Sequence, residues 1–222
     1  HGGQNTRTAA KMIALQNGPG YVYAAGDATQ SYADTKSAEV VRQFVYIRPD
    51  HFIIYDRVAS VRPEQRKEVI LHFQHLPEQT GKQQFRADNG GRLFVTTLLP
   101  KNAAIELVGG PGREFWASGR NWELSGGKQW EEKYRVAGGW RMEVSDPKAA
   151  QASRFLHFLQ AAAPGTPSAT GAEYLQGASE DGVRFADADG KVWHVWFNRD
   201  GKVDCRIEVA PSGMRTPDGA PH

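Results

Sequence analysis

The chain of 222 residues lacks the features that mark several large classes of protein. Cys205 is its only cysteine, which excludes an internal disulfide framework and a cysteine-based metal site. No stretch approaches the ~20 consecutive apolar residues of a transmembrane helix. Lysine and arginine number 27 against 25 acidic residues, far from the concentrated positive charge typical of nucleic-acid binding. We therefore expect neither a membrane nor a nucleic acid as a partner.

Long helical periodicity is also missing. Apolar and polar residues instead alternate in short blocks that end at Gly, Pro, Asn or Asp, a pattern that predicts strands joined by turns. The predicted strands cover residues 38–47, 51–58, 67–76, 91–98, 104–108, 130–136, 140–144, 153–161, 183–186, 192–198 and 203–209. Short strands at such close spacing favour an all-β fold, an antiparallel β-sandwich of about eleven strands in stacked sheets.

The distribution of turn residues also suggests how the chain is divided. Residues 1–161 carry most of the predicted strands and form the main β-sandwich. Residues 162–171 are rich in Ala, Pro, Thr, Ser and Gly, which predicts a connection between the main sandwich and the final strands. The final strands, within residues 172–210, are expected to pack on or beside the sandwich, and residues 211–222 to form a frayed tail.

Three histidines lie in apolar segments where a metal or catalytic role has to be weighed against a place in the core. His72 and His75 have a metal-like spacing, but residues three apart on a strand point to opposite faces, so we expect no shared ion unless the strand ends between them. His157 lies within an apolar strand and is predicted to be a core residue. The sequence contains neither a nucleophile-elbow signature nor a phosphate-binding loop.

Arginines and tryptophans provide the candidates for sugar binding. Five arginines follow the early strands, at positions 42, 48, 57, 62 and 66. An arginine fork suits the carboxylates and sulfates of acidic polysaccharides, but a solvated sheet face explains the arginines as well and is the favoured interpretation. Large aromatics in a sandwich mostly fill the core. Trp116 and Trp122 lie in a Gly-rich loop and are the better candidates for stacking on sugar rings.

Segments in order along residues 1–160 resemble the β region that follows the catalytic domain in heparinase II/III-like polysaccharide lyases. They are GDATQSY at 26–32, VRQFVYI at 41–47, IIYDRV at 53–58, KEVILH at 67–72, GRL at 91–93, TLLP at 97–100, VGGPGREFW at 108–116 and FLH at 155–157. The resemblance is specific in combination. It implies an enzyme with an α/α toroid followed by stacked antiparallel sheets, which cleaves uronic-acid polysaccharides by β-elimination.

In the family, the catalytic and zinc-binding residues come from the toroid and from a His-x-His-x-Asp-like and a His-Asn-Thr-like segment. Neither segment occurs here. The first four residues, HGGQ, resemble the stretch that follows the last of those segments. We therefore assign no catalytic residue and no cofactor to this chain, since a zinc site of the parent protein would lie upstream. The chain alone is expected to be inactive.

The resemblance leads to the hypothesis that the chain is the C-terminal β-sandwich of a lyase, which supports the upstream toroid and lines the cleft for an acidic polysaccharide. The candidate substrate-binding residues are then Tyr32, Arg42, Trp116 and Trp122. By family analogy the protein would be periplasmic or secreted. A free-standing carbohydrate-binding module and a purely structural β module are the alternatives. A binding module would need exposed aromatics on one face instead of a large apolar docking surface.

Overall fold

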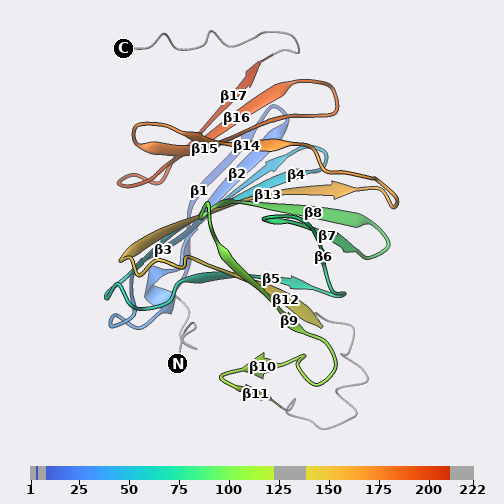
Figure 1. Cartoon of the computed structure of the whole chain (residues 1–222). Coiled ribbons are helices and arrows are strands. Elements are labelled where there is room, and N and C mark those ends of the chain that lie inside the picture. The colour runs from blue at the N-terminus through green and yellow to red at the C-terminus, as the bar shows by residue number, and fades with distance from the viewer. Residues whose placement is uncertain (1–3, 5–8, 123–138, 211–222) are drawn as a thin grey trace. The chain divides into compact units, whose positions relative to one another are not determined.

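The computed structural model describes residues 4, 9–122 and 139–210, which form seventeen strands and one short 3-10 turn (Figure 1). The predicted all-β antiparallel class is therefore confirmed. Among these residues no helix is long and apolar enough to cross a membrane. The strands are β1 (Lys11–Gly18), β2 (Tyr21–Asp27), β3 (Ser37–Ile47), β4 (His51–Ser60), β5 (Glu68–Phe73), β6 (Glu78–Gly81), β7 (Gln84–Asp88), β8 (Arg92–Leu99), β9 (Ala104–Gly109), β10 (Trp116–Ala117), β11 (Arg120–Asn121), β12 (Trp140–Ser145), β13 (Ala152–Ala162), β14 (Ala172–Gln176), β15 (Glu180–Ala186), β16 (Val192–Asn198) and β17 (Cys205–Ala210).

The estimate of about eleven strands was too low. The strands missed are β1, β2, β6, β7, β10, β11 and β14. Most of them are short or polar, so they bury too little apolar surface to show a period of two. The predicted strand 67–76 was too long, because β5 ends at Phe73 before the bend that leads to Pro77. The predicted strand 130–136 and the predicted tail 211–222 lie outside the described residues.

The chain divides into two compact units, residues 1–168 and 169–222. In the first unit an eight-stranded sheet has the order β1-β2-β3-β4-β13-β8-β7-β6, a three-stranded sheet has the order β5-β12-β9, and β10 pairs with β11. In the second unit one sheet has the order β14-β15-β16-β17. Every strand pair in these sheets is antiparallel.

The three-stranded sheet packs on only part of the eight-stranded sheet. The buried residues that join the two layers are Val69, Phe73, Phe85, Val95, Met142, Val144 and Phe155. They come from β5 and β12 on one side and from β7, β8 and β13 on the other, and no described residue of β1, β2 or β3 is among them. Figure 1 shows β5, β12 and β9 as a separate layer below β13 and β8.

The same face of the eight-stranded sheet continues over β1, β2, β3 and the start of β4 without that cover. We call this part, formed by Met12, Leu15, Phe44, Tyr46 and Phe52, the open face. Met12 and Leu15 are 70% and 67% exposed, and the three aromatic residues are only partly buried. The Tyr46 and Phe52 rings stack at 4.8 Å between centroids, and Phe44 lies 5.9 Å from Phe52. The open face is therefore apolar, aromatic and accessible.

The two-layer arrangement predicts a contrast between Phe155 and Leu15. Phe155 is fully buried between the layers, so Phe155→Ala should cost about 3–5 kcal/mol because it leaves a cavity. Leu15→Ala on the open face should change stability by less than about 0.5 kcal/mol. Hydrogen exchange of the β13 backbone amides measures the stability of the first unit in each variant. Equal losses for the two variants would contradict the arrangement.

Candidate functional site

A bidentate ion pair lies at the boundary between the covered and the open part of the sheet. Arg42 on β3 stands opposite Asp56 on β4, and Asp56 stands opposite Phe155 on β13. The Nε of Arg42 donates to Oδ1 of Asp56 at 2.7 Å, and Nη2 donates to Oδ2 at 3.0 Å. The side chain of Asp56 is only 6% exposed, whereas that of Arg42 is 50% exposed. A buried carboxylate therefore holds an arginine that reaches solvent.

The charges of this pair compensate each other. Burial raises the pKa of Asp56 above its ordinary value, and the hydrogen bond and charge of Arg42 offset part of that rise. Burial by itself would lower the pKa of Arg42, but its hydrogen bond to Asp56 and the charge of that residue raise it. The Nη1 of Arg42 makes no hydrogen bond within the described residues. The site therefore offers oriented N–H donors rather than an uncompensated positive charge.

Tyr32 lies close to the Arg42–Asp56 pair. It follows the 3-10 turn η1 (Thr29–Ser31), which is fixed by hydrogen bonds from the Thr29 amide to Asp27 Oδ1 and from the Val40 amide to Thr29 Oγ1, both 2.9 Å long. The Ala28 amide also donates to the Val40 carbonyl at 2.8 Å, so the turn that carries Tyr32 lies against β3 close to Arg42. The structure thus brings together two of the four predicted binding residues.

His157 lies on β13, two residues along the strand from Phe155, the cross-strand partner of Asp56. It stands between Ile54 and Thr97 in the sheet and is completely buried, as the sequence predicts for a core residue. Its Nδ1 is 3.1 Å from Thr97 Oγ1, but its Nε2 has no partner within the described residues. Burial and the nearby charge of Arg42 lower the pKa of His157 to about 3. The imidazole is therefore neutral at ordinary pH and is shielded from solvent.

The lowered pKa of His157 predicts a loss of stability in acid. In the unfolded chain a histidine takes up a proton near pH ~6.5, whereas the folded chain resists this until about pH 3. Stability is therefore complete above the unfolded pKa and should fall by about 1.4 kcal/mol for each pH unit below it. Urea unfolding at pH 7 and pH 5 measures this loss. His157→Gln should remove that part of the slope, whereas His72→Gln, at an exposed position, should retain it. An unchanged slope in His157→Gln would contradict the assignment.

Trp116 and Trp122 lie elsewhere in the first unit. Trp116 begins β10 and Trp122 directly follows β11, in a hairpin that Figure 1 shows beyond the three-stranded sheet. The guanidinium of Arg113 lies 5.0 Å from the Trp116 ring, and that of Arg120 lies 3.3 Å from the Trp122 ring. Arg141 of β12 donates to the Trp116 carbonyl and anchors the hairpin. The four predicted binding residues therefore occupy two separate places.

The arginines of the early strands do not form a basic patch. Each of the five has an acidic or amide partner: Arg42 with Asp56, Arg48 with Asn17, Arg57 with Glu39, Arg62 with Glu64, and Arg66 with Glu68 and Glu143. The exposed pairs of Arg62 and Arg66 contribute little to stability, whereas Asp56 and Arg57 are buried in theirs. The solvated sheet face that the sequence favours therefore fits the exposed Arg42, Arg48, Arg62 and Arg66, but not the buried Arg57.

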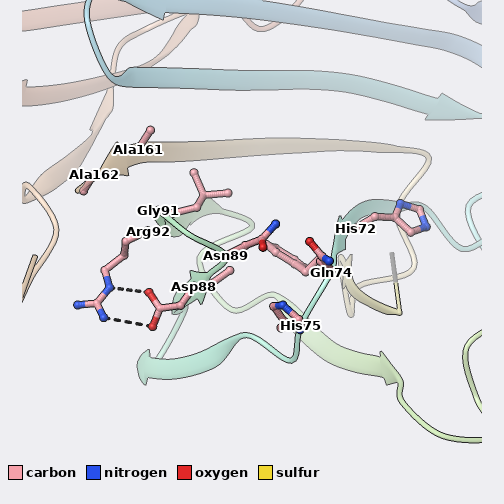
Figure 2. Close-up of a pocket in the computed structure, with 12 residues that line it drawn as sticks. His72, Gln74, His75, Asp88, Asn89, Gly91, Arg92, Ala161 and Ala162 are labelled. Atoms are coloured by element: carbon pink, nitrogen blue, oxygen red, sulfur yellow. Dashed lines mark hydrogen bonds and ion pairs between the residues drawn. The ribbon is translucent and has the colours of Figure 1, made fainter. Parts of the chain in front are cut away.

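Strand β5 ends between His72 and His75, which is the condition under which the sequence leaves a shared ion open. Because β5 ends at Phe73, His75 lies beyond the strand, and the rule that side chains alternate between faces does not apply to it. Both histidines line one surface hollow, but Figure 2 shows their rings apart. Among the described residues no group of three or more His, Cys, Asp or Glu side chains is arranged to hold a metal. Burial raises the pKa of the Cys205 thiol, which disfavours the reactive thiolate.

Sequence reasoning missed Asp56, although a signal for it was present. Arg48, Pro49 and Asp50 separate the predicted strands 38–47 and 51–58, and Pro and Asp are typical turn residues. The structure pairs Ile47 with His51 across these three residues. Counting five residues outward from this pair along both strands places Arg42 opposite Asp56. The alternation of Arg42, Phe44 and Tyr46 likewise assigns them to one face. The Thr97 partner of His157 depends on the non-local pairing of β13 with β8, which no local pattern reveals.

Comparisons with known proteins agree with the family resemblance at the level of the fold. No protein-family model matches the chain, and no curated protein matches it. Among solved structures, a heparan sulfate lyase from Pedobacter heparinus matches 94% of this chain with 13% identity and a TM-score of 0.51. A heparinase III matches 91% with 13% identity and a TM-score of 0.54, and a second heparinase III matches 90% with 11% identity and a TM-score of 0.52.

At these identities the likeness concerns the fold alone. This chain spans only 27–29% of the length of those proteins. The resemblance to the β-sandwich region of heparinase-like lyases is thus confirmed as a likeness of fold.

Proposed function

We propose that this chain is the β-sandwich module of a polysaccharide lyase that cleaves uronic-acid-containing polysaccharides by β-elimination. In this proposal the module supports an upstream catalytic toroid and lines one side of the substrate cleft. The fold likeness to heparinase III supports the class of parent protein. The observation that carries the proposal is the open face, because a self-sufficient sandwich would bury it.

The chemistry of the open face suits a protein partner. Met12 and Leu15 expose aliphatic side chains, while Phe44, Tyr46 and Phe52 offer rigid aromatic surface. Contiguous apolar surface of this kind marks an interaction site in a soluble protein. Helices with an apolar stripe are a matching partner, since they bury that stripe against a sheet face. We infer that the helical toroid of the parent protein is this partner.

The place of Arg42 and Tyr32 suggests what the module contributes to the cleft. Both lie beside the open face, at the boundary with the covered part of the sheet. The free edge of the Arg42 guanidinium can donate to a uronate carboxylate, and the Tyr32 hydroxyl can bond to a neighbouring sugar oxygen. An arginine does not act as a base, and His157 is enclosed. The role of Arg42 and Tyr32 in this proposal is to bind and orient the polymer, while proton transfer belongs to upstream residues.

The remaining parts of the proposal follow from the parent class. The chain itself is proposed to hold no cofactor and to lack eliminase activity, because the family's zinc and proton-transfer segments do not occur in it. A parent that degrades external polysaccharide would act in the periplasm or outside the cell. Trp116 and Trp122 are proposed as a second contact for the polymer, through ring stacking.

A binding titration tests the role of Arg42. Simple removal of Arg42 would leave the buried Asp56 unpaired, at a cost of about 3–5 kcal/mol. The double variant Arg42→Met and Asp56→Leu avoids this. It should bind an alginate-derived or heparin-derived tetrasaccharide about tenfold more weakly than the natural chain at low salt, because a charge-assisted hydrogen bond is lost. Isothermal titration calorimetry measures the difference.

The matched control is Arg62→Ala, which removes an exposed arginine that pairs with an exposed glutamate. Arg199 would be a poor control, since it bonds to Asp181 and to three backbone carbonyls. Equal affinity in the double variant and the natural chain would refute the role of Arg42. Tight, salt-insensitive binding of a neutral oligosaccharide to the open face would instead favour a free-standing carbohydrate-binding module.

A further inference from the structure

The first unit contains a hollow of about 330 Å³ that none of the preceding roles involves. It opens at one end of the space between the two layers. It is surrounded by the end of β5 with its following bend, by the β7–β8 turn and by the end of β13 (Figure 2). Phe155, opposite Asp56, and Ala161 of the hollow are six residues apart on β13, about 20 Å along the strand. The hollow is therefore distinct from the Arg42 site.

The floor of the hollow is a row of two alanines and one leucine on one face of the sheet. Ala87, Leu93 and Ala161 stand in one row across β7, β8 and β13, and Gly91 precedes β8. With Phe73 of β5 they make up the apolar lining. Glycine is not required at position 91. Its φ is not positive, and an added Cβ would meet only the Ala162 carbonyl oxygen, at an ordinary contact distance of 3.6 Å. The floor is thus apolar and shallow, with room for a flat molecule.

Polar side chains form the rim. The amides of Gln74 and Asn89 and the imidazole of His75 line the hollow, and these side chains make no hydrogen bond to any described residue. In Figure 2 the His72 ring projects away from these three. Side-chain amides and neutral imidazoles each offer both a donor and an acceptor. In histidine the tautomer decides which ring nitrogen donates. The rim can therefore bond to groups that both donate and accept, as hydroxyls do.

The charged residues of the hollow are already paired. Arg92 donates to both carboxylate oxygens of Asp88, at 2.6 and 3.1 Å, and its Nη1 donates to the Thr166 carbonyl. All three guanidinium nitrogens are therefore engaged within the protein. No described lysine or further arginine lines the hollow. A neutral ligand is consequently favoured over an acidic one.

We propose that this hollow binds one neutral pyranose unit of a saccharide. The C–H face of the ring would lie on the apolar floor, and its hydroxyls would bond to Gln74, His75 and Asn89. The volume lies near the lower end of the ~300–1,000 Å³ typical of ligand pockets, which suits a single ring. The proposal does not depend on the lyase function, because neither the open face nor Arg42 takes part in it.

A nuclear magnetic resonance titration of the whole chain with methyl glucoside tests this, with methyl glucuronoside as its acidic counterpart. We expect shifts of the Gln74, His75 and Asn89 resonances and a dissociation constant on the order of 1–10 mM. The affinity for the glucoside should be unchanged between about 20 and 200 mM salt, because no free charge is involved. The glucuronoside should bind no more tightly.

Two variants locate the site independently. The double variant Gln74→Ala and His75→Ala should bind the glucoside at least about fivefold more weakly, and Gly91→Leu should abolish binding because its side chain fills the hollow. His194→Ala, in the second unit, should leave binding unchanged. Absence of shifts at the three rim residues of the natural chain, or salt-dependent preference for the glucuronoside at this hollow, would overturn the proposal. Either outcome would leave the role of Arg42 untouched.

Discussion

Eight strands form one continuous sheet, but the layer β5-β12-β9 that packs on it has only three strands and cannot cover the whole face. This difference in width is the constraint on which the other features of the first unit depend. Over β7, β8 and β13 the two layers enclose a close-packed core. Over β1, β2, β3 and the start of β4 the same face is left accessible, with Met12 and Leu15 at its edge. The hollow beside Gln74 lies at one end of the covered part, over the row of two alanines and one leucine.

The boundary between the two parts explains the electrostatics of the candidate site. A carboxylate at position 56 lies beside the core and loses its hydration, so it is stable as an anion only with a partner. Arg42 supplies that partner from the neighbouring strand while its outer edge stays in solvent. His157, one step further into the core, meets both burial and a nearby positive charge, and it is held neutral by both. A gradient of burial across adjacent strands thus sets three different charge states.

Local sequence patterns predicted much of this fold. Period-two alternation and the turn at residues 48–50 located β3 and β4, and the hairpin register follows from that turn. Patterns failed for β6 and β14, whose side chains are mostly polar or exposed. They also could not show that Tyr32 and Arg42 come together while Trp116 and Trp122 lie elsewhere. That separation depends on the pairing of β13 between β4 and β8 and on the insertion of β12 between β5 and β9, which are contacts between distant parts of the chain.

The central claim is that the open face is a docking surface for an upstream helical domain. Hydroxyl-radical footprinting tests it most directly, by comparing this chain with a longer polypeptide that carries the upstream region. The account predicts rapid oxidation of Met12 in the chain alone and at least about fivefold slower oxidation in the longer polypeptide, since buried thioethers are shielded. Leu76, exposed near the hollow, should react equally in both. Equal oxidation of Met12 in the two proteins would contradict the account.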